Sequence, residues 1–238
     1  MGKKRDMGRA AVPRRLSEVG DWDVEADVVV VGFGGAGACT ALEARAEGAD
    51  VLLLERSSGG GGTTALSTGQ IYLGGGTAIQ KVCGFEDSAE EMFKYLMASC
   101  GPGVDEAKIR QFCDGSVEHF DWLVAHGLPF KESFYGDGSY TPTDDCLSYS
   151  GSEQAWPYLD LARPAPRGHT VRQDGIEAGG QLMRSLVAAV EGSGTRIQTD
   201  TLVETLVVDD DRRVVGVVAH KDQQEQLVGA RAAVVLCA

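Results

Sequence analysis

A glycine-rich turn that follows an apolar run constrains this chain more than any other feature. The run at 27–31 (DVVVV) leads straight into GFGGAG at 32–37. In such a turn the first glycine permits a tight bend, the second lets a ligand approach the backbone, and the third lets the next helix pack on the sheet. The N–H groups and the dipole at the start of that helix favour phosphate. The predicted phosphate-side residues are Gly32, Gly34, Gly35, Ala36 and Gly37.

An acidic residue ends the next apolar run, VLLLE, at Glu55. It follows the glycine motif by about 20 residues, the spacing at which a carboxylate hydrogen-bonds ribose hydroxyls. The small-residue stretch 36–47 between the two runs is typical of a helix. The sequence therefore predicts a βαβ opening, with strands at 27–32 and 50–55, that binds a dinucleotide.

A second glycine-rich segment, RSSGGGGTTALSTGQIYLGGG at 56–76, follows Glu55 directly. Glycine at this density allows positive φ and close approach to a ligand. A flexible linker is the other interpretation, but Leu66 and the run Ile71–Leu73 interrupt the segment with apolar side chains that a solvated linker does not need. We therefore expect a loop that contacts the cofactor.

The rest of the chain predicts helices, then loops, then strands. Ser88 and Glu91 form a capping box for a helix at 89–99, and Gly115 divides an apolar-faced helical stretch at 105–126. Residues 127–175 are rich in turn-forming pairs, and 179–191 is again helical. The C-terminal quarter predicts strands with a hairpin turn at 209–212 and a final strand, AAVVLCA.

This order of elements distinguishes two cofactors. A nicotinamide domain continues with further βα units, whereas this chain places a second glycine loop after Glu55 and a β-meander before its last strand. That order suits FAD. The predicted fold class is α/β: a Rossmann-like FAD-binding domain of the glutathione-reductase type, with a β-meander and a helical insertion, incomplete at the C-terminus.

Composition excludes several other classes. The net charge of −13 argues against nucleic acid or an anionic membrane as partner, and no apolar run is long enough to span a bilayer. Residues 1–24 carry the basic run and are expected to form a disordered tail. The six scattered cysteines form no CxxC pair or metal-like cluster, which predicts reduced thiols in a cytoplasm, packing roles for these residues, and no metal site.

Residues 25–238 resemble the flavoproteins of the fumarate reductase and succinate dehydrogenase superfamily, and within it the 3-ketosteroid dehydrogenases of the Δ4(5α) and Δ1 types. The segments that carry the resemblance are the glycine region at 28–76, IYLGGGTAIQKVCGFEDS, GSVEHFDWLVAHGLPFKESFYG and APRGH. The resemblance implies the N-terminal portion of an enzyme that oxidises a carbon–carbon bond next to a ketone, with an apolar ketone such as a steroid as its small-molecule substrate.

The resemblance also implies residue roles. Glu55 matches the ribose carboxylate, and Val203 matches the residue whose backbone meets the adenine. The second glycine-rich segment, 56–76, lacks the histidine through which some relatives bind flavin covalently, so non-covalent FAD is implied. The other implied cofactor residues are Arg56 and Ser57 on the adenosine side, and Gly62, Thr63, Thr64, Thr68 and Gly69 toward the flavin ring.

In the relatives, a substrate domain and a return segment follow the strand that here ends at Ala238. Their proton-transfer residues lie in that part, so no catalytic residue is assigned, and the chain alone is expected to bind FAD poorly and not to turn over steroid. Arg167 and His169 are candidates for substrate contacts or for a surface loop. Two alternatives stay open: a fumarate-reductase-like enzyme acting on a small unsaturated acid, and a catalytically silent nucleotide-binding fragment.

Overall fold

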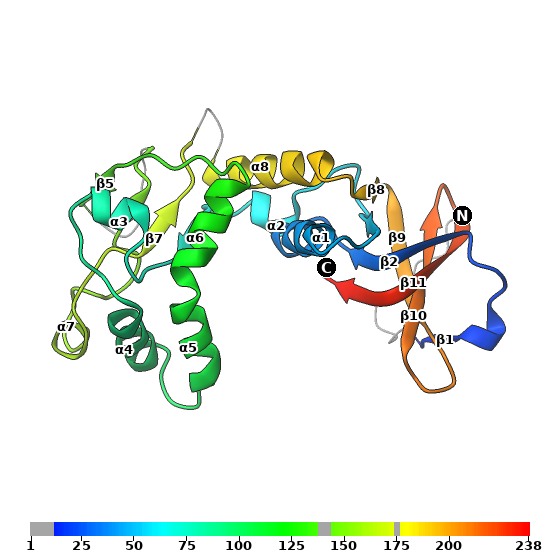
Figure 1. The fold of residues 1–238 in the computed structure, drawn as a ribbon, viewed down its shortest axis with the longest axis horizontal. Coiled ribbons are helices and arrows are strands. Elements are labelled where there is room, and N and C mark those ends of the chain that lie inside the picture. Colours follow the sequence, from blue (N-terminus) through cyan, green and yellow to red (C-terminus); the bar gives the residue numbers. More distant parts are fainter. Residues whose placement is uncertain (1–11, 138–143, 174–176) are drawn as a thin grey trace, which may run out of the picture. The chain divides into compact units, whose positions relative to one another are not determined.

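A computed structural model describes residues 12–137, 144–173 and 177–238 (Figure 1). The chain divides into two compact units. Unit 1 comprises Met1–Gly62 and Val187–Ala238, and unit 2 comprises Thr63–Leu186. The glycine motif and the C-terminal strands therefore fold together, and the central part of the sequence forms a unit of its own.

Unit 1 is built on a seven-stranded sheet in the order β1-β9-β10-β11-β2-β3-β8. Strands β11, β2, β3 and β8 run parallel, whereas β9, β10 and β11 form an antiparallel meander. The bounds are β1 (Arg14–Arg15), β2 (Val24–Val31), β3 (Val51–Leu54), β8 (Arg196–Gln198), β9 (Thr201–Val208), β10 (Val214–Lys221) and β11 (Gln224–Leu236). The predicted βαβ opening, the hairpin turn at 209–212 and the returning last strand are confirmed.

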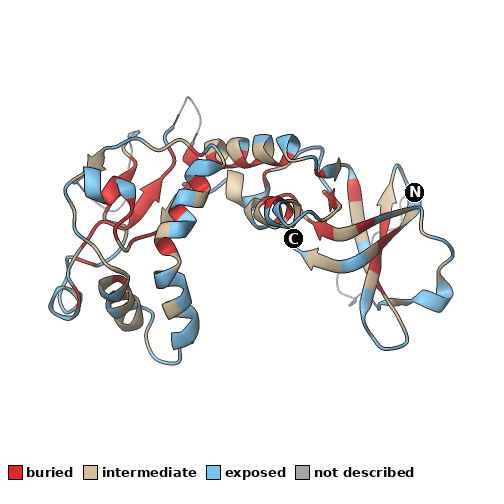
Figure 2. Ribbon diagram, viewed as in Figure 1, coloured by how far each residue is buried: buried red, intermediate tan, exposed pale blue. Residues whose placement is uncertain are grey.

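Helix α1 (Gly35–Ala46) connects β2 to β3 and contacts β2, β3 and β11. Strand β3 is buried at every position, as expected for a parallel strand with both faces covered, and Figure 2 shows these buried positions. Alternation along β2 places Val29 and Val31 in an apolar cluster with residues of β3, β10 and β11. This core fixes the carboxyl ends of β2 and β3, where the candidate site begins.

The predicted disordered tail does not reach residue 24. Arg14–Arg15 pairs in parallel with β9, and a short 3₁₀ turn follows at Leu16–Glu18. The Arg14 guanidinium donates to both carboxylate oxygens of Glu225, at 2.8 and 2.7 Å. The expectation of disorder was wrong for residues 12–24, because Arg14–Arg15 pairs with β9 and the Arg14 side chain finds a partner far along the sequence. Residues 1–11 lie outside the described residues.

Unit 2 contains a four-stranded sheet in the order β4-β7-β6-β5, with short helices around it. Its strands are β4 (Gln70–Tyr72), β5 (Phe134–Tyr135), β6 (Leu147–Ser148) and β7 (Gly168–Thr170). The helices are α3 (Ala78–Val82), α4 (Ala89–Ser99), α5 (Glu106–Asp114), α6 (Ser116–Ala125) and α7 (Tyr158–Leu161). Two helices cross the unit boundary in the sequence: α2 (Gly62–Ala65) and α8 (Ala178–Gly192).

The predicted helices of unit 2 are present, although only the Ser88 half of the predicted capping box forms, because the Glu91 carboxylate bonds to Lys94 and to the Arg163 N–H. The Ser88 hydroxyl accepts a hydrogen bond from the Glu91 N–H at the start of α4. Gly115 separates α5 from α6, as its position in the apolar stretch predicted. Short strands and turns make up most of the described part of 127–175, also as expected, and the predicted helix at 179–191 corresponds to α8.

All six cysteines are free thiols. Burial raises the pKa of Cys113 to about 11, so this thiol stays protonated and packs as an apolar group. No cluster of histidine, cysteine and carboxylate side chains suited to a metal ion occurs among the described residues. Over the same residues, we find no helix with the length and apolar character needed to cross a bilayer.

Candidate functional site

The glycine motif lies at the edge of unit 1 where the parallel strands end. The Gly32 N–H donates to the carbonyl of Leu54 at 2.8 Å, and the Cys237 N–H donates to the carbonyl of Val31, also at 2.8 Å. β2 therefore ends between β3 and β11, and the chain leaves it toward β3. Such a position, where the order of strands changes direction, is where open α/β sheets bind ligands.

Gly32 needs to be glycine for both conformation and space. Its φ is +102°, a region that L side chains rarely adopt. A Cβ at this position would lie 2.9 Å from the carbonyl oxygen of Cys237. The turn out of β2 is therefore held against the end of β11 by backbone alone.

Gly37 packs closely on the backbone of Gly32. A Cβ on Gly37 would lie 1.9 Å from the carbonyl oxygen of Gly32, a distance that no real contact allows. The first turn of α1 thus packs directly on the peptide group of Gly32. This is the physical role that the sequence predicted for the third glycine of the motif.

The start of α1 is made of small residues. Gly34 is the N-cap residue and has no side chain, and the first turn contains no acidic residue. Gly35, Ala36 and Gly37 form this first turn. The positive end of the helix dipole is suited to a phosphate, and small residues leave room for it.

Glu55 holds the first glycine loop from the end of β3. One carboxylate oxygen accepts the Phe33 N–H at 2.7 Å, and the other accepts the Ser57 N–H at 2.7 Å. A carboxylate has about four acceptor positions. Two backbone bonds therefore leave Glu55 able to accept bonds from a pair of ribose hydroxyls while it keeps the loop in place.

The second glycine loop lies against the first within unit 1. Gly62 has φ +55°, and a Cβ there would lie 3.3 Å from the Cα of Gly34. The Gly61 N–H donates to the carbonyl of Phe33 at 2.8 Å. The two glycine loops that the sequence singled out are therefore in contact, as a single dinucleotide cradle requires.

A packing contact behind these loops was missed from the sequence. Phe33, the variable residue of the motif, is 2% exposed. A Cβ on Gly60 would lie 2.8 Å from both the Phe33 ring and a methyl group of Val187, a residue of α8. Gly60 is therefore small because two apolar side chains cover it, and only the fold brings Val187 to this place.

The start of β9 joins the site through backbone bonds. The Thr201 N–H donates to the carbonyl of Glu55 at 2.9 Å, and the Asp200 N–H donates to the carbonyl of Ser57 at 3.0 Å. Val203 follows on β9, half-buried against the unit 1 core and paired with Ala219. In the described part of the chain, β1 pairs with β9 only at Val207 and Val208, so it leaves the strand edge at Val203 uncovered.

The predicted site residues divide between the two units. Gly32 through Gly37, Glu55, Gly62 and Val203 come together in unit 1, with Arg56 and Ser57 exposed beside them. Thr63, Thr64, Thr68 and Gly69 belong to unit 2. There Thr63 and Thr68 are exposed, whereas Gly69 is buried and has φ +66°.

Arg167 and His169 do not lie on a surface loop, so that alternative is wrong. Both residues are 0% exposed, at the start of β7 in unit 2. Arg167 forms a bidentate ion pair with Asp87, with N–O distances of 2.9 and 2.7 Å. Because both side chains are fully buried within unit 2, neither is available for a substrate at the surface of that unit.

His169 is held as a neutral ring. Its Nδ1 lies 3.1 Å from the carbonyl oxygen of Arg167, which only accepts, so Nδ1 carries the proton. Its Nε2 then accepts from the Thr77 hydroxyl at 2.8 Å. Burial lowers the pKa of His169 to about 4, in keeping with this neutral tautomer.

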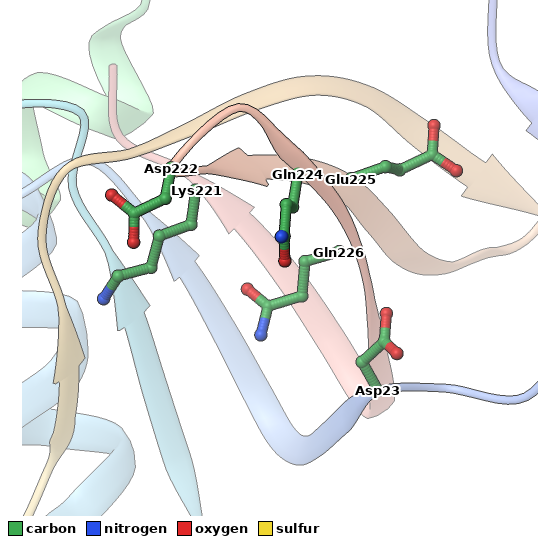
Figure 3. A pocket seen from close by; sticks show the side chains of 6 residues that line it. All are labelled: Asp23, Lys221, Asp222, Gln224, Glu225 and Gln226. Carbon is green, nitrogen blue, oxygen red and sulfur yellow. The ribbon is translucent and has the colours of Figure 1, made fainter.

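A pocket of about 300 Å³ lies beside the β10–β11 hairpin of unit 1 and is lined by polar side chains (Figure 3). The residues that line it are Lys221, Asp222, Gln224, Glu225 and Gln226 of the hairpin, together with Asp23. Because Val228 pairs with Val24 and Leu236 with Val31, this hairpin lies at the amino end of β2. The glycine motif follows the carboxyl end of β2, so the pocket is not part of the predicted site.

Comparisons with known proteins agree with the geometry. A family model described as an FAD binding domain matches residues 27–238. The chain is 37% identical over 201 residues to the 3-oxo-5-alpha-steroid 4-dehydrogenase of Comamonas testosteroni, covering 82% of this chain and 37% of that protein. It is 28% identical over 199 residues to an NADH:fumarate oxidoreductase of Klebsiella pneumoniae, covering 84% of this chain and 19% of that protein.

Solved structures give the same picture. The fold matches the 3-ketosteroid-delta4-(5alpha)-dehydrogenase of Rhodococcus jostii RHA1 with a TM-score of 0.91 at 53% identity, over 94% of this chain and 48% of that one. It matches a flavocytochrome c3 fumarate reductase with a TM-score of 0.72 at 27% identity, over 90% of this chain and 34% of that one. The chain therefore spans about half, or less, of the length of these relatives.

The residues present fit FAD. Gly32 and Gly37 allow the close backbone packing that a pyrophosphate-binding turn needs, the small residues at the start of α1 suit a pyrophosphate, and Glu55 keeps acceptor positions for a ribose. Family, fold and local geometry thus agree. This chain belongs to the FAD-binding domain family of flavoprotein oxidoreductases, with 3-ketosteroid dehydrogenases among its relatives.

Proposed function

We propose that this chain is the cofactor-binding part of a flavoprotein that dehydrogenates a 3-ketosteroid at the 4,5 bond. The observation that carries the proposal is the match at 53% identity and a TM-score of 0.91 to a 3-ketosteroid dehydrogenase whose structure contains 4-androstene-3,17-dione. When bound, FAD accepts the hydride that leaves one ring carbon while a proton leaves its neighbour, so the single bond becomes a double bond.

The proposed cofactor contacts follow from the unit 1 geometry. The first turn of α1 and Gly32 hold the pyrophosphate, and Glu55 hydrogen-bonds the adenosine ribose. Arg56, Ser57 and the backbone of Val203 lie at the end of the sheet where the adenosine extends. In unit 2 the residues proposed to face the flavin are Thr63, Thr64, Thr68 and Gly69, which continue the second glycine loop from Gly62.

We propose that FAD is bound without a covalent link. The second glycine loop, 56–76, contains no histidine. Of the four histidines in the chain, His169 is fully buried with both ring nitrogens bonded, and His220 bonds to Glu204 on the meander. Denaturation should therefore release all of the flavin into solution.

The same considerations rank the alternatives. A fumarate-reductase-like activity on a small unsaturated acid has weaker support, because the fumarate-related matches are 27% and 28% identical. Such a site also needs cations to clamp carboxylates, and the buried Arg167 is already paired with Asp87. A silent nucleotide-binding fragment is the third candidate.

The free cysteines and the absence of a spanning helix among the described residues are consistent with the cytoplasmic location that we propose.

Exchanging the charge of Glu55 tests the cofactor part of the proposal. Glu55→Lys should weaken FAD binding by roughly 10- to 100-fold, because each hydrogen bond to a charged group contributes about 1.5–3 kcal/mol. Flavin fluorescence titration measures this change. Glu47→Lys is the matched control, since Glu47 is exposed at the end of α1 and its substitution changes the net charge equally.

Two further measurements make the Glu55 result decisive. Glu55 also accepts the Phe33 and Ser57 N–H groups, so the urea midpoint of the FAD-free variant shows how much of the loss reflects a loosened loop. Equal affinity in Glu55→Lys and the wild type would mean that Glu55 is only a charge at the end of a strand. Stabilisation of the wild type by NAD and not by FAD would overturn the flavin assignment itself.

A chimera tests the steroid part. This chain replaces the corresponding first half of the Rhodococcus jostii dehydrogenase, to which its fold is similar over 94% of its length. We expect the chimera to bind FAD and to lose its visible flavin absorbance under anaerobic conditions when the 4,5-saturated 5α counterpart of 4-androstene-3,17-dione is added. Full flavin occupancy without bleaching would count against the steroid assignment and leave FAD binding intact.

A further inference from the structure

The first turn of α8 meets the loop at 64–69 backbone to backbone within unit 2. A Cβ on Gly179 would lie 2.2 Å from the carbonyl oxygen of Ser67 and 2.7 Å from that of Thr64. Ordinary contacts of a Cβ begin at 3.4 Å. No side chain therefore separates the loop from the helix, and none could be added without moving one of them.

In the loop, Gly69 must also be glycine, because of its contact with the first turn of α8. Gly69 has φ +66°, and a Cβ on it would lie 2.4 Å from the carbonyl carbon of Ala178 and 2.5 Å from the nitrogen of Gly179. The loop is also a bonded turn: the Ser67 hydroxyl donates to the Thr64 carbonyl at 2.7 Å and accepts the Gly69 N–H at 3.1 Å. Two glycines 110 residues apart in the sequence are thus reciprocal parts of one contact.

This contact explains why Gly179 stands inside a helix. Gly179 is the second residue of α8, and because glycine has a lower helix propensity than alanine, the helix gains nothing from it locally. Gly192, the last residue of α8, has open space where its Cβ would be. The need for glycine at 179 therefore comes from the loop, and the loop is the segment with the proposed flavin-side residues.

We propose that Gly179 is a positioning residue for the flavin-side loop: the backbone of the first turn of α8 is the surface on which Thr64–Gly69 is laid. The inference rests on the proposed function, because the flavin-side role of this loop belongs to that proposal. In this proposal Gly179 acts through the loop and not through a contact with FAD. It fixes where Thr64 and Thr68 stand, and no glycine motif or capping signal in the sequence identifies it.

Gly179→Ala tests the proposal, with Gly192→Ala on the same helix as the matched control. In the FAD-free chain, hydrogen–deuterium exchange should quicken in the peptide that covers 63–69, where the N–H groups of Leu66, Ser67 and Gly69 are bonded locally. We expect at least about a tenfold rise there, with α4 unchanged, because only the seat of the loop is altered. The control should leave both segments at the wild-type rate.

The second readout uses FAD. Gly179→Ala should bind FAD roughly tenfold or more weakly and show a shifted visible flavin spectrum, because misplacing site residues by about 1 Å can change binding and reactivity strongly. A merely structural role would lower the urea midpoint without changing the spectrum of the bound flavin. Wild-type exchange at 63–69 in Gly179→Ala overturns the proposal, whether or not FAD binds. Faster exchange with unchanged FAD affinity and spectrum would show that the loop does not face flavin, which overturns the positioning role but leaves FAD binding by unit 1 untouched.

Discussion

Replacing Gly37 with alanine should nearly abolish FAD binding, with a loss of at least about 100-fold in affinity, because the added methyl displaces the helix that we propose to hold the pyrophosphate. The Cβ would lie 1.9 Å from the Gly32 carbonyl oxygen. A rotamer change cannot relieve a clash this close, because the Cβ position and the Gly32 carbonyl are both fixed by the backbone. The first turn of α1 must therefore move away from β2, and its N–H groups move with it.

The same substitution should destabilise unit 1 by about 1–3 kcal/mol, as overpacking does in other cores. FAD titration and urea denaturation of the FAD-free chain measure the two effects separately. Gly20→Ala is the control, because nothing lies within 4 Å of a Cβ at that exposed position. Wild-type affinity in Gly37→Ala would mean that α1 does not carry the pyrophosphate.

The unit 1 site could be predicted because its demands are local. Gly37 packs on Gly32, and Glu55 accepts the N–H groups of Phe33 and Ser57, so residue type and spacing report this local geometry directly. Gly60 and Gly179 are also restricted to glycine, but Val187 of α8 helps to restrict Gly60, and the loop at 64–67 restricts Gly179, so both restrictions involve residues far along the sequence. Glycine in a glycine-rich segment gives no sign of which neighbour requires it.

The errors have the same origin. The tail was expected to be disordered from its basic composition, yet Arg14 pairs with Glu225, which is 211 residues away. Arg167 was considered for a substrate contact or for a surface loop, yet Asp87, 80 residues earlier, pairs with it in the interior. Charge in a sequence identifies a need for a partner but does not say whether solvent, substrate or another side chain fills it.

Arg167→Met is the second change with a large expected effect, and it should destabilise unit 2 by about 3–5 kcal/mol. Both side chains of the Arg167–Asp87 pair are 0% exposed. Burial by itself would raise the pKa of Asp87, but the hydrogen bonds and the charge of Arg167 outweigh it and hold that pKa below its usual value. Without Arg167, Asp87 is a buried charge that must be protonated or exposed.

The effect extends beyond the pair because Asp87 also organises a loop. Its Oδ2 accepts the Gly75 N–H at 2.9 Å and a hydrogen bond from the Gln80 side-chain NH₂ at 3.1 Å. The side-chain Oε1 of Gln80 in turn accepts the N–H groups of Gly76 and Thr77. The Arg167 carbonyl accepts the Leu73 N–H. The buried network therefore holds the N–H groups of residues 73 and 75–77, in the segment that follows β4. This segment should loosen when Arg167 is removed.

Arg163→Met is the matched control for Arg167→Met. Arg163 pairs with Glu86 at 3.1 Å, but these side chains are 49% and 88% exposed, so losing that pair should change stability by no more than about 1 kcal/mol. Unfolding should be followed in a Trp22→Phe background, because Trp22 lies in unit 1 whereas Trp122 and Trp156 report unit 2. If Arg167→Met shifts the unit 2 midpoint no more than Arg163→Met does, the buried pair does not organise this unit. If the double variant Asp87→Leu/Arg167→Met recovers much of the loss, the unpaired Asp87 charge is its cause, and what remains unrecovered reports the backbone bonds that Asp87 makes to the loop.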